Sequence, residues 1–273
     1  GKYVNTFDVT SESQLKDLIP HGHLAFHGHN GPEIHDLSTL QDQDTITIRK
    51  QVFCGKLVHT LEGHTNYVRS VAWNSQGTLL ASGSDDRTIK IWDTKTWNCI
   101  QTLEGHTGSV NSVAWNLQGI FLVSGSWDNT IKIWDSNTWN CIQTLEGHTQ
   151  GVLSVAWNSQ GTLLASGSSD RTIKIWDSKT WKCLQISEGH TRGVLSVAWN
   201  SQGTLLASGS WDCRIKVWDS NTWKCVQTLK GHIHYVYSVA WNYQGLLAGG
   251  SADNTIKIWD PKTWECIQTL EGH

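Results

Sequence analysis

Short runs of branched and aromatic residues, separated by polar turns, fill most of the chain after residue 56. In the first such stretch the runs have the composition of β-strands: Val68–Trp73, Leu79–Ser82, Thr88–Trp92 and Cys99–Leu103. Turn-forming residues stand between them: Asn74–Gly77, Asp85–Asp86 and Asp93–Lys95. The apolar spacing of a helix does not occur in these stretches. The pattern predicts four short antiparallel strands and an all-β fold.

The stretch is repeated with a period of 42 residues. Gly-His dipeptides mark the period, because His64, His106 and His148 follow one another at that interval. Trp-Asp closes the third run of each copy: Trp92-Asp93, Trp134-Asp135, Trp176-Asp177, Trp218-Asp219 and Trp259-Asp260. Of the 17 tryptophans, only Trp127 and Trp211 fall outside three positions that recur in every copy. Residues 57–273 therefore contain five regular repeats.

Gly-His before the first strand and Trp-Asp at the end of the third, both in register, resemble the WD40 repeat. The resemblance covers residues 57–273. It implies a WD40-type β-propeller, in which each copy supplies one four-stranded antiparallel blade beside a central channel. It also implies a scaffold for protein complexes, and arrays of such similar copies resemble the sensor regions of larger multidomain proteins.

Residues 1–56 contain no tryptophan, and we expect them to form a divergent N-terminal blade or a segment docked on the ring. The stretch Gly22–His29 aligns without a gap with the second strand of a regular copy. The other strands of this blade would be Leu15–Ile19, then Thr45–Ile48 or Glu33–Leu37, and finally Lys56–Glu62. The ring then holds six blades, and residues 1–273 form a single domain.

Tyr3–Phe7 also has the pattern of an outer strand, which makes seven outer strands for six blades. Either this strand has another role, or the chain was cut from a longer array. The lack of methionine and the ending on Gly272-His273 favour the second interpretation. If the ring stays open, its blade edges would pair with another chain.

The resemblance implies a structural hydrogen-bond relay inside each blade, with these members in the first two copies: His64, Ser82, Asp86, Trp92, His106, Ser124, Asp128 and Trp134. A buried imidazole, hydroxyl and indole N–H each need a partner, and one carboxylate can orient them all. Ser, His and Asp also make up hydrolase triads. A nucleophile is needed once, in a cleft, whereas this set recurs in all five copies. We therefore expect no enzyme and no cofactor.

Charged residues make up 16% of the chain and the net charge is -3, a balance that argues against nucleic-acid binding. The repeat lysines are spread one per copy and form no continuous track. No apolar stretch approaches the roughly 20 residues of a membrane span. Five of the seven cysteines occupy one position of successive copies, too far apart to pair, which predicts free thiols and a cytoplasmic protein.

Histidines crowd the N-terminal segment, and a strand there would project His27 and His29 to one face. This pair is a weak candidate for a transition-metal site. The alternative is that both are solvent-facing positions of a degenerate strand.

Three positions differ between copies while the rest of the repeat is nearly constant. Two flank the first valine of the inner strand, and the third precedes the relay aspartate. Their larger or polar side chains are Tyr67, Arg69, Asp85, Asn111, Trp127, Leu153, Leu195, Trp211, Tyr235 and Tyr237. Strand order places all three at the rim where the fourth-to-first and second-to-third connections emerge. We call this rim the upper face.

We expect a non-catalytic scaffold that binds a protein or peptide on the upper face, because Trp, Tyr and Arg are typical of interaction hot spots. Two alternatives remain at this point. Trp127 and Trp211 would stack on a sugar or another small ligand, or the N-terminal histidines would bind a metal. The alternative to recognition is that these are tolerant surface positions whose residues drift.

Overall fold

The computed structural model describes residues 26–27, 33–34 and 57–272, which fall in two units, Gly1–Val58 and His59–His273. In the first unit, β1 (Phe26–His27) pairs antiparallel with β2 (Glu33–Ile34). The other strands expected in residues 1–56 lie outside the described residues. The sixth blade therefore stays a prediction.

The second unit contains five four-stranded antiparallel sheets, which are the five predicted blades. The first two comprise β3 (Val68–Trp73), β4 (Leu79–Ser84), β5 (Ile89–Asp93), β6 (Cys99–Leu103), β7 (Val110–Trp115), β8 (Phe121–Ser126), β9 (Ile131–Asp135) and β10 (Cys141–Leu145). The third and fourth comprise β11 (Val152–Trp157), β12 (Leu163–Ser168), β13 (Ile173–Asp177), β14 (Cys183–Ser187), β15 (Val194–Trp199), β16 (Leu205–Ser210), β17 (Ile215–Asp219) and β18 (Cys225–Leu229). The fifth comprises β19 (Val236–Trp241), β20 (Leu247–Ser251), β21 (Thr255–Trp259) and β22 (Cys266–Glu271).

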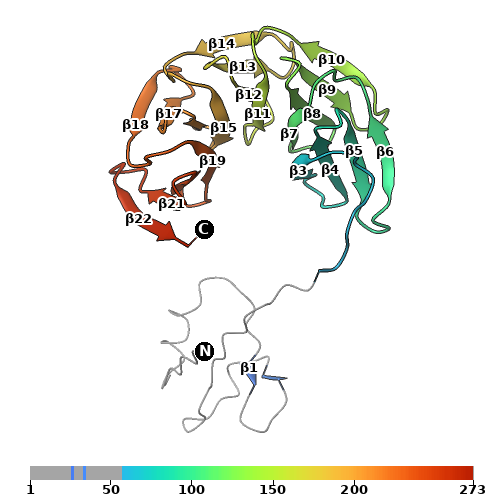
Figure 1. The fold of residues 1–273 in the computed structure, drawn as a ribbon, viewed down its shortest axis with the longest axis horizontal. Coiled ribbons are helices and arrows are strands. Elements are labelled where there is room, and N and C mark those ends of the chain that lie inside the picture. Colours follow the sequence, from blue (N-terminus) through green and yellow to red (C-terminus); the bar gives the residue numbers. More distant parts are fainter. Residues whose placement is uncertain (1–25, 28–32, 35–56, 273) are drawn as a thin grey trace. The chain divides into compact units, whose positions relative to one another are not determined.

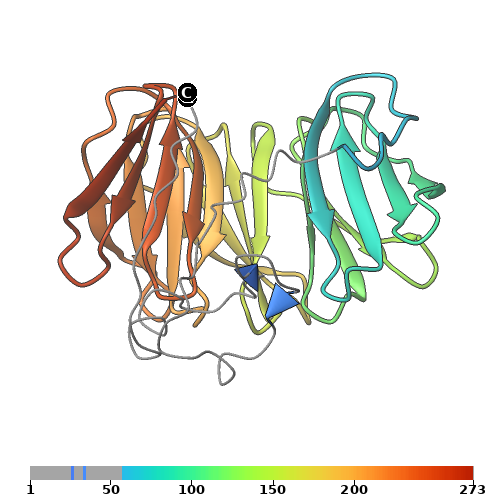
Figure 2. The same cartoon turned by 90° about the horizontal axis from the view of Figure 1, so that it is seen from below.

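Successive blades stand side by side in an arc, with β3, β7, β11, β15 and β19 innermost (Figure 1). Each sheet runs from its innermost to its outermost strand in chain order. The connecting loops gather at the two ends of the blades, as Figure 2 shows. Among the described residues the fifth blade does not pack against the first, so the ring is not closed by these five blades.

The core lies between neighbouring blades. Ile89 and Ile91 of the first blade pack with Val110 and Val113 of the second, and all four are buried. Two hydrogen bonds cross the same boundary: the Val113 N–H donates to Ser70 Oγ at 3.1 Å, and the Trp115 indole donates to the Ala72 carbonyl at 3.2 Å. Each blade thus depends on its neighbours for burial.

The first and the fifth blade each have one face that no described residue covers. Val71 is 61% exposed, whereas Val113 at the same position of the second blade is 5% exposed. At the other end Leu270 is 45% exposed, whereas its counterpart Leu229 is 4% exposed. The exposed faces of the first and fifth blades correspond to the two faces that pack together wherever two blades are neighbours.

One predicted strand is wrong for the part that the structure describes. Residues 57–62, taken as the fourth strand of the N-terminal blade, contain no strand. A run of this composition becomes an outer strand only beside a third strand that shares its backbone hydrogen bonds. None of the described strands pairs with it.

Candidate functional site

The relay residues form one connected set of hydrogen bonds in the first blade. His64 Nδ1 lies 2.7 Å from Asp86 Oδ2, and His64 Nε2 lies 2.7 Å from Ser82 Oγ. The Trp92 indole donates to the same Ser82 hydroxyl at 2.8 Å. Thr88, which the sequence reasoning did not include, donates to Asp86 Oδ1 at 2.7 Å. In the second blade His106, Ser124, Asp128 and Trp134 repeat the arrangement.

Burial acts on the relay aspartates against their hydrogen bonds. For Asp128, burial raises the pKa, but hydrogen bonds from His106 and Thr130 lower it by more, so the net pKa lies well below its usual range. The carboxylate therefore stays ionised and accepts bonds from the histidine, the threonine and the Thr107 N–H.

The relay is complete in four blades, not in five as the sequence reasoning assumed. Gly249 stands where the other blades have serine, and His232 Nε2 lies 3.1 Å from the Gly249 carbonyl oxygen instead. In the fourth blade Arg214 replaces the threonine. In the complete copies the serine and histidine are buried or nearly so, out of reach of a substrate. In the first blade these bonds join the residue before the inner strand to the second and third strands of the same sheet.

The variable positions lie together at the upper face. In every blade the third one donates its backbone N–H to the carbonyl of the first, as Trp127 does to Ser109 at 2.9 Å and Trp211 to Gly193 at 3.0 Å. The repeat thus holds both side chains on one rigid hydrogen-bonded frame.

In the first blade the side chains at the variable positions interact with one another. Arg69 forms a two-point ion pair with Asp85, with Nε 2.8 Å from Oδ1, and its guanidinium stands 5.6 Å from the centre of the Tyr67 ring. The hydrogen bond from Arg69 is the main cause that lowers the pKa of Asp85. Tyr67 remains 74% exposed.

In the second and third blades most of these positions serve packing. Asn111, predicted to contact a partner, instead donates its amide to the Val152 carbonyl of the next blade at 2.8 Å. Leu153 of the third blade and Leu195 of the fourth are half-buried. Trp127 lies over Gly151, where a β carbon would collide with the indole, and it remains 47% exposed.

Aromatic rings gather on the fourth and fifth blades. The rings of Trp211 and Tyr235 are 6.5 Å apart between centres, and those of Tyr235 and Tyr237 are 6.4 Å apart. His234 stacks edge-on against Tyr235 at 4.4 Å. These four side chains form a continuous surface across two blades, and three of them were predicted from the sequence.

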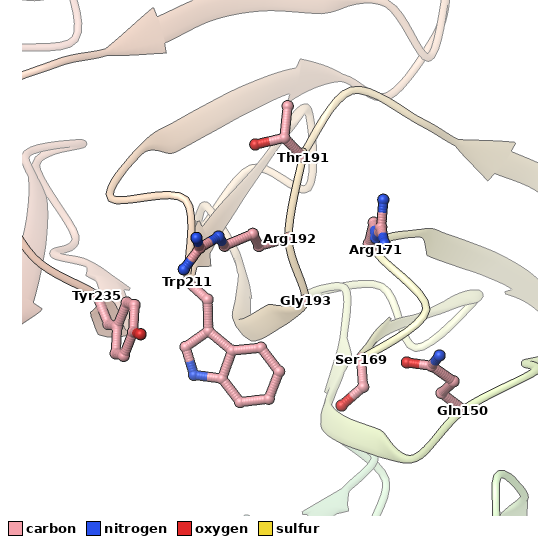
Figure 3. Close-up of a pocket in the computed structure, with 8 residues that line it drawn as sticks. All are labelled: Gln150, Ser169, Arg171, Thr191, Arg192, Gly193, Trp211 and Tyr235. Carbon is pink, nitrogen blue, oxygen red and sulfur yellow. The ribbon is translucent and has the colours of Figure 1, made fainter.

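A pocket of about 600 Å³ opens beside this aromatic surface. Trp211 and Tyr235 lie on one side of it, and Gln150 and Ser169 on the other (Figure 3). Arg171 and Arg192 line it as well. The pocket thus combines apolar rings with two cationic groups and hydrogen-bonding side chains, a typical composition of a recognition site.

The sequence reasoning missed Gln150, Arg171 and Arg192, although the signal was present. Two further positions vary between copies. One reads Asn66, Gly108, Gln150, Arg192 and His234, and the other reads Arg87, Asn129, Arg171, Cys213 and Asn254. Comparing all positions near the upper face would have included the pocket residues.

The other features predicted from the sequence lie only partly within the described residues. The side chains of His27 and His29 lie outside the described residues, and no group of three or more possible metal ligands occurs among those described. The six described cysteines are unpaired, and the five on the outer strands are exposed. No helix in the described part of the chain is long and apolar enough to cross a membrane.

A model of the WD domain, G-beta repeat, matches residues 55–93, 97–135, 139–177, 181–219 and 223–260. The chain belongs to the WD40 family. WD40 repeats are generally non-enzymatic scaffolds for protein interactions, and the resemblance seen in the sequence is confirmed.

Relatives match over one or a few repeats. The probable cytosolic iron-sulfur protein assembly protein 1 of Debaryomyces hansenii is 63% identical over 38 residues, 14% of this chain and 10% of that protein. The WD repeat-containing protein slp1 of Schizosaccharomyces pombe is 32% identical over 93 residues, 34% of this chain and 19% of that protein. A ribosome biogenesis protein BOP1 homolog of Drosophila virilis is 54% identical over 39 residues, 14% of this chain and 5% of that protein. The chain therefore spans less than a fifth of each of these relatives.

Proposed function

We propose that the chain is a protein-interaction scaffold that binds a protein or peptide through the upper face of its third to fifth blades. The observation that carries the proposal is the pocket beside Trp211 and Tyr235. It is built from positions that change between otherwise similar repeats, so the variation is concentrated where side chains converge on a cavity.

Two further facts support a scaffold. Two relatives are named for assembly processes, cytosolic iron-sulfur protein assembly and ribosome biogenesis. The five exposed thiols of the outer strands fit a reducing compartment such as the cytoplasm, where the chain would meet its protein partners.

The test is affinity capture with identification of the bound proteins by mass spectrometry. The upper-face variant carries Trp211→Ser and Tyr235→Ser, which install residues that other copies have at the same positions, Ser169 and Ser109. Because these residues occur at the same positions of other copies, we expect circular dichroism to show an unchanged fold. We expect the variant to lose partners that the unchanged chain captures reproducibly.

The matched control changes exposed apolar residues at the opposite rim. Leu117→Ser and Tyr243→Ser install the Ser75 residue of the first copy, and both side chains are exposed. Equal capture by the unchanged chain and the upper-face variant, or loss in the control alone, would place recognition elsewhere. Binding to a glycan array that is lost when Trp211 is replaced would favour the sugar alternative.

A further inference from the structure

The arginines on the upper face differ in whether they are neutralised. Arg69 is paired with Asp85. Arg171 and Arg192 are exposed, and neither forms an ion pair or donates a side-chain hydrogen bond to a described residue. Both guanidinium groups therefore line the pocket without an ion-pair partner among the described residues.

Two acidic residues directly adjoin pocket residues in the sequence, Asp170 and Asp212, and both are already engaged. Asp170 accepts bonds from His148, Thr149 and Thr172, and its side chain is 6% exposed. Asp212 is held in the same way by His190, Thr191 and the Arg214 N–H. Because these carboxylates point into the blades, they do not neutralise the arginines.

The pocket also contains an unsatisfied donor. The Ser169 hydroxyl is buried and has no hydrogen-bond partner among the described residues. A buried hydroxyl without a partner costs free energy, and an acceptor on a bound ligand would satisfy it after rotation of the side chain about Cα–Cβ. Figure 3 shows this side chain facing the Trp211 side of the pocket.

Arg171 occupies an unfavourable backbone conformation. Its φ is 74°, a left-handed value that asparagine adopts more readily than arginine. The second and fifth blades have asparagine at this position, Asn129 and Asn254, with φ of 69° and 65°. The third blade thus carries a cation where asparagine serves in two other blades, and the first blade does the same with Arg87 at a φ of 71°.

We propose that the pocket binds an acidic peptide segment, in which anionic side chains meet Arg171 and Arg192 while a neighbouring apolar side chain lies against Trp211 and Tyr235. The charge and the unpaired donors favour carboxylate or phosphate groups as acceptors. This proposal rests on the proposed function, because it names the class of partner for the same site.

The test is selection of peptides from a random library displayed on phage, followed by fluorescence anisotropy with labelled synthetic copies of the enriched sequences. We expect enrichment of Asp or Glu next to an apolar residue. Replacing those acids by Asn or Gln should weaken binding about tenfold or more, and higher salt should weaken it further. Copies with phosphoserine in place of the acids distinguish phosphate from carboxylate as the preferred group.

The variants are borrowed from other repeats. Arg171→Asn and Arg192→Gln install the Asn129 and Gln150 residues, and each should weaken binding of the acidic peptide about tenfold. Arg87→Asn is the matched control, because Arg87 has the same backbone position and a φ of 71° in the first blade but does not line the pocket. It should leave binding unchanged.

The outcomes separate the two proposals. If enriched peptides are neutral or basic, or if Arg171→Asn and Arg192→Gln bind as tightly as the unchanged chain, the acidic partner is wrong while the site stands. If no peptide is enriched whose binding requires Trp211 and Tyr235, both the acidic partner and the peptide site at this pocket are wrong.

Discussion

Val110 of the second blade lies against Gly83 of the first so closely that a β carbon at residue 83 would stand 2.7 Å from Val110 Cγ1. The same contact joins Gly125 to Val152 and Gly167 to Val194. At the end of the array Gly250 has the same position in its strand, but nothing lies within 4 Å of a β carbon there. The glycine is therefore required by the following blade and not by its own backbone.

The contact predicts opposite results for two equivalent substitutions. Gly167→Ala should lower the free energy of unfolding by about 1–3 kcal/mol, because the added methyl group forces the third and fourth blades apart. Gly250→Ala should change it by less than about 0.5 kcal/mol or raise it slightly, since alanine restricts the unfolded chain. Urea unfolding monitored by circular dichroism measures both. Equal losses would show that the exposed face of the fifth blade is covered in solution.

The strands of the five blades could be predicted because each residue type recurs in five copies at one spacing, so turns and apolar runs reinforce one another. The strand expected at residues 57–62 failed, because an outer strand forms only beside a partner and composition alone does not supply one. Predicting an edge strand therefore needs both the local residue pattern and the presence of a neighbouring strand to pair with.

For the candidate site, variation between copies identified the upper face but not the use of each residue. Asn111 and Arg69 vary as much as Trp211 does, yet the first bonds the Val152 carbonyl and the second pairs with Asp85. Whether a polar side chain is free or occupied depends on distances within the folded blade for Arg69 and between blades for Asn111, and the order of residues does not give either distance. The pocket could only be assembled once three blades were placed beside one another.

The missing serine of the fifth relay allows a reciprocal test. Ser166→Ala removes the hydroxyl that bonds both His148 and the Trp176 indole, leaving two buried groups unpaired, and should cost about 2–3 kcal/mol. Gly249→Ser restores the hydroxyl in the fifth blade and should stabilise the chain by about 1 kcal/mol. A β carbon at residue 249 would stand 2.5 Å from the end of the Ile215 side chain and 3.1 Å from the Trp259 ring, so both side chains must shift to accommodate the serine. Thermal unfolding of the two variants checks the pair, and a loss of stability in both would contradict a stabilising relay.

The relay aspartates should make the chain sensitive to acid. The pKa of Asp86, Asp128, Asp170, Asp212 and Asp253 is lowered in the folded state, so unfolding takes up protons once the pH approaches the ordinary value of about 3.9. Their contribution is fully present at neutral pH and is lost as the pH falls below about 4. The urea midpoint should therefore stay nearly level from pH 7 to 5 and then fall.

A variant isolates one of these groups. Asp128→Asn removes one titrating carboxylate, so it should be less stable at pH 7 and should lose less of its remaining stability between pH 5 and 3 than the unchanged chain. Proton uptake on unfolding, measured from the pH dependence of the urea midpoint, is the readout. A slope identical to that of the unchanged chain would remove Asp128 from the acid response.

Trp211 and Gly193 should be coupled energetically. A β carbon at residue 193 would lie 2.6 Å from the Trp211 indole, so Gly193→Ala must displace the ring that borders the pocket. In a double-mutant cycle with Trp211→Ser, the cost of Gly193→Ala should shrink by about 1 kcal/mol, because the ring is no longer there to be displaced. If the two changes in unfolding free energy were strictly additive, the indole would move without cost and its position would not depend on Gly193.

Arg171→Asn should stabilise the chain. Asparagine tolerates the left-handed φ of 74° better than arginine, and neither the guanidinium nor its charge is used by a described neighbour. We expect a gain of about 0.5–1 kcal/mol in thermal or urea unfolding, and a similar gain for Arg87→Asn at φ 71°. If the arginine of the third blade is kept for binding, the stabilised Arg171→Asn variant will bind acidic peptide more weakly, whereas Arg87→Asn will gain stability without loss of binding. A destabilised Arg171→Asn variant would show instead that this side chain supports the fold.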